Sequence, residues 1–352
     1  MFYRKEEAFM IRMAVFDTKP YDRLSLERCE HEGIAWEFFE TKLDASTVSL
    51  AQGFDGVVAF VNDDLCREVI DALHAYGVRL IALRCAGYNQ VDVRAAFGKI
   101  HIVRVPAYSP EAIAEHTMAL LLTSIRRIHK AYNRTREFNF SIVGLCGFEL
   151  NGKTVGVIGA GKIGRAFIRI CQGFGMQVLA YDKHPSPIEG VTFVSLEELY
   201  SRSDVISLHC PMNEENYHMI DRGAMARMKE GVVLLNTSRG GLIDAEDLIE
   251  GIKEKRIGAA CLDVYEEESD IFFEDKSGHI LRDDVLARLL SMPNVLITSH
   301  QAFLTEEALD SIAETTVENI RSFFRDGVCE NEVCYHCERL DDCRKARRTA
   351  CF

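Results

Sequence analysis

Short apolar runs alternate with stretches of helical periodicity along almost the whole chain. In the first part, a helix is predicted over 64–76 and strands are predicted at 13–16, 57–61, 80–83 and 100–105. In the second part, strands are predicted near 155–158, 178–181, 205–208, 232–235, 259–264 and 295–298. Such alternation is typical of α/β proteins with parallel sheets.

Two longer helices mark the expected domain boundaries. Ser109-Pro110-Glu111 has the N-cap, first-position proline and first-turn acid of a helix start. The helix that it opens is predicted to run to about Arg136 and to connect two domains. Another amphipathic helix, over 305–325, is expected to fold back on the first part. The predicted domains are 1–108 with 305–333, and 109–304, followed by an extension over 334–352.

The most specific pattern lies in 155–182. A strand-like run leads into Gly159-Ala160-Gly161-Lys162-Ile163-Gly164, then a helical stretch and a second strand-like run ending in Asp182. In dinucleotide-binding folds the three glycines make the turn, let backbone N–H groups approach a pyrophosphate, and let the helix pack on the strand. An acid at the position of Asp182 binds the adenosine ribose and repels a 2′-phosphate. The pattern predicts a Rossmann-type domain that binds NAD; an ordinary strand-to-helix turn is the alternative.

Composition narrows the class of partner. The 352 residues, 47% of them hydrophobic, suffice for two domains with sizeable cores. The net charge of −13 argues against a nucleic-acid or membrane partner, and no apolar run approaches the about 18 residues of a membrane span. The charged N-terminus lacks the apolar core of a signal peptide, so we expect a cytoplasmic protein whose cysteines are thiols. Met10 and Met13 are alternative start positions, because strand-like sequence begins at Ile11.

Three polar residues follow apolar runs of the second part, where a doubly wound sheet binds its ligands. Arg239 has the planar fork that binds a carboxylate, and His300 has a side chain suited to proton transfer near neutral pH. Glu268 is an acid able to orient such a histidine. Together they suit hydride transfer to a 2-keto acid. The alternatives are a turn-closing surface arginine, a structural histidine and a solvated acidic loop.

Several stretches carry a family resemblance. NTSRGGLID (236–244), LDVYEEE (262–268) and SHQAFLT (299–305), after GAGKIG (159–164), resemble the D-isomer-specific 2-hydroxyacid dehydrogenase family. RCAGYNQVD (84–92), VRVPAYSPEAIAEH (103–116), DVISLHCP (204–211), ENYHMI (215–220) and IFFEDKSGHILRDD (271–284) are similar to the members that interconvert pyruvate and D-lactate. The likeness covers about residues 11–333.

The resemblance implies a role for each matched residue. Arg239 binds the substrate carboxylate and polarises the ketone, His300 donates the proton in reduction and accepts it in oxidation, and Glu268 hydrogen-bonds His300. Backbone N–H groups near Ala86 and Gly87 help to hold the carboxylate, and Tyr108 lines the same site. The implied cofactor contacts are Gly159, Gly161, Lys162, Ile163, Gly164, Asp182, Cys210, Pro211, Asn216, Thr237, Ser238, Arg239 and Asp263, the last on the nicotinamide carboxamide.

The expected fold is therefore a Rossmann-type doubly wound sheet inserted into a smaller, flavodoxin-like α/β substrate domain. The expected activity is the NAD-dependent interconversion of pyruvate and D-lactate by a homo-oligomer, since the family commonly forms dimers or tetramers. One alternative is a relative that acts on a larger 2-keto acid or on phosphoglycerate. The other alternative is a dinucleotide-sensing protein related to transcriptional corepressors.

The C-terminal tail departs from the family. It contains Cys334, Cys337, Cys343 and Cys351, with a C-x2-C element at its start. Four thiolates are able to bind zinc or an iron–sulfur cluster, although only the C-x2-C element is typical of such sites. Redox-sensitive thiols and a short helical extension are the alternatives.

Overall fold

The computed structural model describes residues 10–268, 271–336, 343 and 348–352. The chain forms two compact units: unit 1 comprises 1–109 and 305–352, and unit 2 comprises 110–304. The break before Pro110 falls at the predicted helix start. Among the described residues, no helix combines the length and the apolar character needed to cross a membrane.

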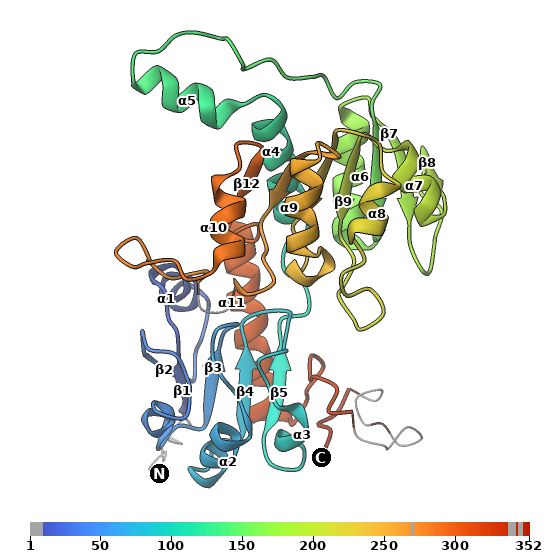
Figure 1. Cartoon of the computed structure of the whole chain (residues 1–352). Coiled ribbons are helices and arrows are strands. Elements are labelled where there is room, and N and C mark those ends of the chain that lie inside the picture. Colours follow the sequence, from blue (N-terminus) through green and yellow to red (C-terminus); the bar gives the residue numbers. More distant parts are fainter. Residues whose placement is uncertain (1–9, 269–270, 337–342, 344–347) are drawn as a thin grey trace, which may run out of the picture. The chain divides into compact units, whose positions relative to one another are not determined.

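Unit 1 contains a five-stranded parallel sheet in the order β2-β1-β3-β4-β5 (Figure 1). Its strands are β1 (Ile11–Val15), β2 (Ile34–Phe38), β3 (Gly56–Ala59), β4 (Leu80–Leu83) and β5 (His101–Arg104). This order is the flavodoxin-like one, as expected. The central strands β3 and β4 are buried along their whole length, which explains their continuous apolar sequences.

The helices of unit 1 include one from the far end of the chain. They are α1 (Pro20–Arg28), α2 (Arg67–Ala75), α3 (Val93–Ala96), α11 (Glu306–Arg321), and the short turns η1 (Val48–Ala51) and η4 (Ser322–Asp326). Ala313, Val317 and Ile320 of α11 share a core with Met13 and Leu80 of the sheet. The last helix therefore returns to the first part of the chain, as predicted, although it gives way to a π-helical turn after Arg321.

Unit 2 contains a seven-stranded parallel sheet in the order β12-β11-β10-β9-β6-β7-β8. Its strands are β6 (Thr154–Ile158), β7 (Gln177–Tyr181), β8 (Val191–Phe193), β9 (Val205–Leu208), β10 (Val232–Asn236), β11 (Ile257–Leu262) and β12 (Val295–Ile297). The order of strands reverses between β6 and β9, which is the doubly wound Rossmann arrangement. Ligands of such sheets bind beyond the carboxyl ends of the strands at this reversal.

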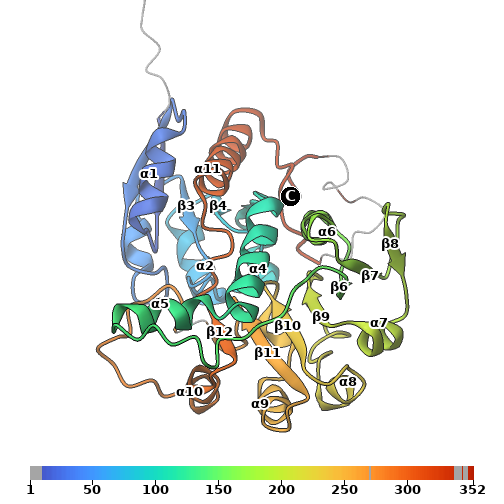
Figure 2. The ribbon, with the colours of Figure 1, turned by 90° about the horizontal axis from the view of Figure 1, so that it is seen from above.

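Helices cover both faces of the unit 2 sheet. They are α4 (Pro110–Ile125), α5 (Ile128–Arg136), α6 (Lys162–Gly173), α7 (Leu196–Arg202), α8 (Arg222–Ala226), α9 (Ala245–Lys253), α10 (Asp284–Ser291) and the turn η2 (Gly240–Leu242). On one face α4 and α6 lie side by side (Figure 2) and share a core that includes Leu121 and Phe167. On the other face α9 and α10 contribute Leu248 and Leu289 to a second core.

Some sequence expectations about these elements are wrong. The single helix predicted to Arg136 ends at Ile125 and a separate helix starts at Ile128, because Arg127 between them has a left-handed backbone with φ 54°. The strands β2 and β8 were not predicted: both lie at sheet edges and are half-exposed, so neither forms a continuous apolar run. The described residues of the tail contain no helix, which contradicts the helical-extension alternative for that part.

Candidate active site

The three glycines of the turn after β6 have different structural roles. Gly159 has φ +96°, and a Cβ there would lie 2.6 Å from the backbone N of Cys210. A Cβ on Gly164 would lie 2.0 Å from the carbonyl oxygen of Gly159, so only glycine lets α6 pack this closely on the turn. At Gly161 a Cβ would meet no atom within 4 Å, and this residue is the N-cap of α6. Two glycines serve packing, and the third leaves open space at a helix N-terminus, where phosphates bind.

Asp182 is tied directly to this turn. Its Oδ2 accepts a hydrogen bond of 2.8 Å from the backbone N of Ala160, and its Oδ1 accepts one of 2.8 Å from the backbone N of His184. A cavity of about 460 Å³ lies beside the carboxylate. It is lined by Ile158, Gly159, Gly161, Tyr181, Asp182, Lys183, His184, Leu196, His209, Cys210, Pro211, Asn213, Glu215, Asn216 and Met219. Its size and its largely apolar wall, with Asp182 beside the glycine turn, suit a nucleotide.

Six of the thirteen expected cofactor contacts line this cavity, namely Gly159, Gly161, Asp182, Cys210, Pro211 and Asn216. Asn216 shapes the loop after β9, because its Nδ2 donates to the carbonyl of Pro211 at 2.8 Å and its Oδ1 accepts from the backbone N of Asn213 at 2.7 Å. Ser238 joins the next loop to it, donating from Oγ to the carbonyl of Cys210 at 2.6 Å. Lys162 and Ile163 begin α6. Thr237 is buried and shares a 2.8 Å hydrogen bond with the hydroxyl of Thr117.

The three expected catalytic residues follow neighbouring strands whose ends are in register. Asn236, the last residue of β10, pairs with Leu262 of β11, and Leu262 pairs with Ile297 of β12. The loops that carry Arg239, Glu268 and His300 therefore start at the same carboxyl edge of the sheet. This convergence is a consequence of register in a parallel sheet, and the linear sequence shows it only as three separate motifs.

His300 and Glu268 form a hydrogen-bonded pair. The distance from Nδ1 of His300 to Oε1 of Glu268 is 2.7 Å, and Oε2 of Glu268 accepts from the backbone N of Tyr265 at 3.0 Å. Since a carboxylate only accepts, Nδ1 carries the proton and Nε2 is left for exchange with a ligand. No partner of Nε2 is recorded in the described part of the chain. About a fifth of each side chain is exposed, 22% for His300 and 23% for Glu268, so the pair can reach a small substrate.

A buried carboxylate, Asp263, holds the loop that presents His300. Its Oδ1 accepts from the backbone N of Gln301 at 2.9 Å and from Thr298 Oγ1 at 2.5 Å, and its Oδ2 accepts from the backbone N of Ala302 at 2.8 Å. Burial opposes the negative charge, but these bonds and one from His116 hold the pKa of Asp263 below its ordinary value. The structure therefore shows Asp263 orienting the histidine loop; its expected bond to a carboxamide stays a prediction.

The loop of Arg239 is shaped by its neighbours. Asn236 spans it, donating from Nδ2 to the carbonyl of Arg239 at 2.8 Å and accepting from the backbone N of Ser238 at 3.0 Å. A Cβ on Gly240 would lie 2.1 Å from the backbone of Tyr265, so this loop packs directly on the segment that leads to Glu268. The guanidinium donates to the carbonyl of Ser238 at 2.7 Å, and no carboxylate partner is recorded for it among the described residues. It remains able to bind an anion.

In unit 1, the expected substrate-binding residues follow β4 and β5. Arg104 donates from Nη1 to the carbonyl of Ala86 at 2.6 Å, and Cys85 Sγ lies 3.3 Å from the carbonyl of Gly87. These contacts hold the backbone at Ala86 and Gly87 in one conformation. Tyr108 lies one residue before the end of the first segment of this unit.

Positioning residues were not predicted from the sequence. Asn236, Thr298 and His116 bond to the loops or to Asp263, and Arg84 braces unit 1 by donating to the carbonyl of Asp17 at 2.6 Å. Each lies within or beside a stretch quoted for the family resemblance. Only the folded structure identifies these residues, because the partner of each one is distant in sequence or belongs to the backbone.

Comparison with known proteins agrees with this architecture. Residues 118–302 match the family described as D-isomer specific 2-hydroxyacid dehydrogenase, NAD binding domain. The chain is 51% identical over 329 residues to the D-lactate dehydrogenase of Escherichia coli, covering 92% of this chain and 100% of that protein. It is 53% identical over 329 residues to a 2-hydroxyacid dehydrogenase homolog of Haemophilus influenzae, covering 92% of this chain and 99% of that protein.

The structural similarity is equally extensive. The apo-structure of D-lactate dehydrogenase from Escherichia coli matches with a TM-score of 0.85 at 48% identity, covering 92% of this chain and 100% of the other. With the family match, the doubly wound sheet and the paired histidine and glutamate, these similarities settle the classification. The chain belongs to the D-isomer-specific 2-hydroxyacid dehydrogenase family and is an oxidoreductase with an NAD-binding domain.

Proposed function

We propose that the protein reduces pyruvate to D-lactate with NADH and catalyses the reverse reaction with NAD. The observation that carries the proposal is the His300–Glu268 pair at the carboxyl edge of the sheet, beside the Arg239 loop and in the same unit as the glycine turn. The relatives support pyruvate as substrate. One is named D-lactate dehydrogenase, and a similar structure, 42% identical, is titled the pyruvate reductase of Chlamydomonas reinhardtii.

The residues of unit 2 fit a dinucleotide. Open space at Gly161, with the N-terminus of α6, suits the pyrophosphate, and Asp182 suits the adenosine ribose. The remaining contacts proposed are Gly159, Lys162, Ile163, Gly164, Cys210, Pro211, Asn216, Thr237, Ser238, Arg239 and Asp263. When bound, NADH supplies the hydride that reduces C2 of the keto acid.

The proposed proton transfer belongs to His300. Glu268 accepts the Nδ1 proton and so holds the ring in one orientation, with Nε2 as the nitrogen that exchanges a proton with the substrate oxygen. In reduction Nε2 gives its proton to the carbonyl oxygen, and in oxidation it takes the proton of the hydroxyl. The guanidinium of Arg239 binds the substrate carboxylate and stabilises the charge that develops on the ketone oxygen. Backbone N–H groups at Ala86 and Gly87, with Tyr108, contribute to the same carboxylate site in this proposal.

The test is a comparison of substrates with the purified chain. NADH oxidation is followed with pyruvate, with longer and branched 2-keto acids, and with a phosphorylated hydroxy-keto acid, and the configuration of the product is determined. The proposal expects the highest kcat/KM with pyruvate and D-lactate as the product. A longer acid preferred by more than about tenfold, which is about 1.4 kcal/mol of barrier, would assign the chain to another substrate.

A matched pair of glycine variants tests the cofactor site. Gly161→Ala adds a methyl group to open space at the turn, and Gly173→Ala adds one at the end of α6, where a Cβ also meets nothing within 4 Å. Both should fold normally. We expect Gly161→Ala to weaken NADH binding by about tenfold or more, because the methyl group occupies the space needed by the pyrophosphate, and Gly173→Ala to leave it unchanged. Equal affinities measured by fluorescence titration would argue against this placement.

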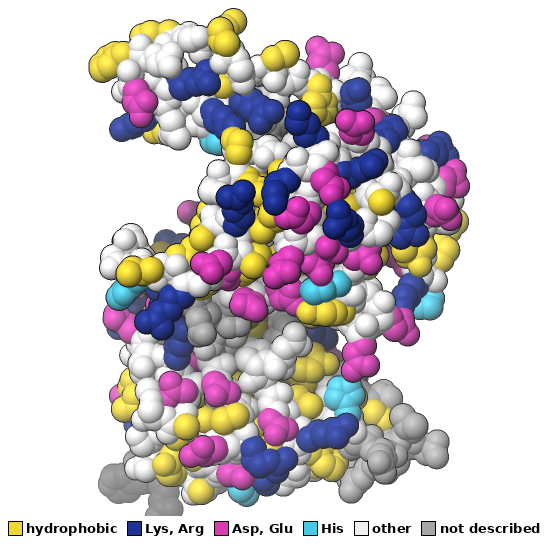
Figure 3. Space-filling model, in the orientation of Figure 1, with side chains coloured by type: hydrophobic (Ala, Val, Ile, Leu, Met, Phe, Trp, Pro, Cys, Tyr) yellow, Lys and Arg dark blue, Asp and Glu magenta, His cyan; other side chains and the backbone are white. Residues whose placement is uncertain are grey.

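We further propose that the protein is a homo-oligomer. The segment 128–149, here called the arm, includes α5 and extends away from the sheet of unit 2 (Figure 1), and hydrophobic side chains gather on it (Figure 3). Phe138, Phe140, Ile142 and Val143 are 73–84% exposed. Contiguous exposed apolar residues mark association surfaces. Light scattering should show that Ile142→Asp with Val143→Asp lowers the molecular mass, whereas Leu24→Asp on α1 does not; a wild-type monomer would contradict the proposal.

A cytoplasmic location is part of the same proposal. The cysteines that the structure describes are all free thiols, the state that a reducing compartment maintains. Fractionation of expressing cells against cytoplasmic marker enzymes would test it, and recovery of the protein with exported markers would contradict it.

A further inference from the structure

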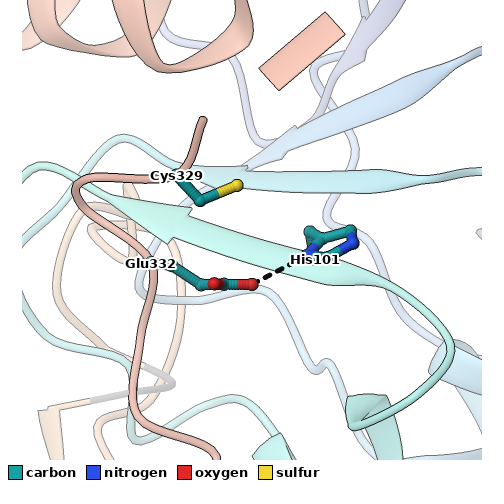
Figure 4. Close-up of side chains that lie close together, drawn as sticks. All are labelled: His101, Cys329 and Glu332. Carbon is teal, nitrogen blue, oxygen red and sulfur yellow. Dashed lines mark hydrogen bonds and ion pairs between the residues drawn. The ribbon is translucent and has the colours of Figure 1, made fainter. Parts of the chain in front are cut away.

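A histidine–glutamate pair in unit 1 lies together with a cysteine. His101 begins β5, and Cys329 and Glu332 lie on the C-terminal segment after α11 (Figure 4). One ligand atom of each side chain lies within 4.8 Å of those of the other two. Among the described residues this is the only group of three or more such side chains that satisfies that spacing. Nitrogen, sulfur and oxygen donors thus converge at one point of the sheet edge.

The backbone fixes the positions of these side chains. The backbone N of Val333 donates to the carbonyl of Ile102 at 2.9 Å, and the backbone N of Arg104 donates to the carbonyl of Asn331 at 3.0 Å. Glu332 and Val103 form an antiparallel bridge. The C-terminal segment therefore runs along β5 like a short extra strand, which holds Glu332 opposite His101 without any ligand present.

One carboxylate oxygen in this group has no partner among the described residues. Oε1 of Glu332 accepts from Nδ1 of His101 at 2.8 Å and from the hydroxyl of Tyr335 at 3.0 Å. Oε2 is buried and accepts no hydrogen bond from the described part of the chain, and the residue as a whole is 1% exposed. A buried oxygen with partial negative charge and no donor is unfavourable, and a cation removes that penalty. Neither His101 nor Tyr335 donates a hydrogen bond to Oε2, since both bond to Oε1. The position of Oε2 in the cluster therefore points to a bound cation.

The last residues of the chain close the group. The ring of Phe352 stacks on His101, with centroids 4.1 Å apart and an interplanar angle of 14°. Thr349 forms an antiparallel bridge to Val328, next to Cys329. Cys351 is buried and close enough to Cys329 for the two thiols to interact electrostatically. The stacked ring of Phe352 holds the imidazole in one plane.

We propose that His101, Cys329 and Glu332 bind one zinc ion, which fastens the C-terminal segment to β5. Zinc accepts this mixture of imidazole, thiolate and carboxylate ligands, whereas calcium and magnesium prefer oxygen alone. A tetrahedral zinc ion holds its ligand atoms about 3.3–3.8 Å apart, so side-chain adjustments of about 1 Å complete the site. Cys351, which interacts electrostatically with Cys329, is a candidate for a further ligand. Zinc binds cysteine as the thiolate, so binding at Cys329 releases a proton.

This site differs from the four-thiol arrangement considered from the sequence. Cys337 lies outside the described residues. Of the other three, Cys334 is exposed, Cys343 is half-buried and Cys351 is buried, and no metal-binding group in the described chain contains them. The proposed site instead contains Cys329, which precedes the tail, and His101, which comes from the first part of the chain.

The direct test is the zinc content of the full chain. Wild-type protein is stripped with a chelator, reloaded with zinc sulfate, freed of unbound ion by gel filtration and analysed by mass spectrometry. We expect about one zinc per chain in the wild type and in Cys334→Ser, and less than about 0.2 in Cys329→Ser and His101→Gln. A wild type below about 0.2 overturns the proposal, and so do Cys329→Ser and His101→Gln variants that retain the wild-type content.

Cobalt(II) reports the ligands independently of the amount bound. A thiolate ligand gives cobalt a charge-transfer absorption in the near ultraviolet, expected in the wild type and in Cys334→Ser and missing in Cys329→Ser. If Cys329→Ser fails to fold, as judged by circular dichroism, His101→Gln supplies the comparison, because His101 is at the surface of the cluster with 13% of its side chain exposed. Cobalt that binds to the wild type without this absorption contradicts the assignment of Cys329.

Discussion

Among the described residues, His300 and His101 each bond to a glutamate through Nδ1 of the imidazole, and the two bonds are nearly equal in length. His300 Nδ1 lies 2.7 Å from Glu268, and His101 Nδ1 lies 2.8 Å from Glu332. Their surroundings differ. The first pair lies at the carboxyl edge of the unit 2 sheet and is about one-fifth exposed, whereas Glu332 is buried and His101 lies at the amino end of β5, beside Cys329.

The difference shows that the environment decides what such a pair can do. An accessible Nε2, oriented by a carboxylate and at the same sheet edge as the Arg239 loop, suits reversible proton exchange with a small acid. A buried pair with a thiol, and with a carboxylate oxygen that has no partner in the described chain, suits a cation. We propose that the pair in unit 2 transfers a proton and that the pair in unit 1 binds a metal ion.

The largest expected effect separates the two histidines. His300→Gln should lower turnover of pyruvate by about a thousandfold, the scale of a lost general acid, and leave NADH binding near normal. His101→Gln should leave turnover within about twofold, because His101 lies at the amino end of its strand. Steady-state assays and fluorescence titration measure both. Activity of His300→Gln within about tenfold of wild type would mean that another group donates the proton.

Asp63 is a buried acid whose recorded hydrogen bonds in the described chain come from the backbone, and it shows what burial does to an acid bonded in this way. Asp63 accepts backbone N–H bonds from Leu43 and Phe60, and burial raises its pKa from 3.8 to about 6. Because the folded pKa exceeds the unfolded one, its contribution to stability is complete well below the unfolded pKa and is lost as the pH rises through 6. The wild type should therefore lose about 3 kcal/mol more than Asp63→Asn between about pH 3 and 8.

Urea denaturation of both proteins at a series of pH values measures this difference. The comparison uses only the change with pH, so any fixed cost of the asparagine cancels. Parallel curves for the two proteins would contradict the raised pKa.

The next effect concerns Arg239, whose loop packs on the segment that leads to Glu268. Arg239→Lys replaces a planar fork with a point charge, so kcat/KM for pyruvate should fall by about a hundredfold, with a clear rise in KM. An unchanged KM would count against Arg239 as the carboxylate site. Arg325→Lys, at an exposed position of unit 1, is the matched control and should leave both constants unaltered.

The smallest effect compares the two glutamates. Glu268→Gln keeps the size of the side chain but removes the charge that orients His300, so turnover should fall by about tenfold or more. Glu332→Gln makes the same change in the buried pair and should leave turnover within about twofold while it reduces zinc content. Equal turnover in both variants would remove the functional distinction between the pairs.

The sequence predicted those parts of the site that are local. The turn at Gly159, Gly161 and Gly164 and the acid at Asp182 lie within one βαβ unit, so their spacing is visible in the linear chain. The pairing of His300 with Glu268 rested on family resemblance, and the structure shows the bond. The bonds of Asp263 to its own loop were not predicted, because backbone N–H groups leave no trace in the pattern of side chains.

The sequence did not predict features that depend on a strained backbone or on contacts between distant residues. The break at Arg127 depends on a left-handed backbone at a residue that ordinarily favours helix. The cluster of His101 with Glu332 joins residues 231 positions apart, and neither occurs in a recognisable motif. From the sequence, the candidate metal ligands were Cys334 and the three cysteines after it, because they are closely spaced. In the structure, the buried thiol that lies next to a histidine belongs to Cys329.

The most direct test of the central claim is the pH dependence of kcat/KM in both directions. If one imidazole gives the proton in reduction and takes it in oxidation, pyruvate reduction must fall as the pH rises and lactate oxidation must fall as the pH drops. The account predicts these opposite pH dependences in the wild type and their disappearance in His300→Gln. Opposite pH dependences that persist in His300→Gln would contradict it.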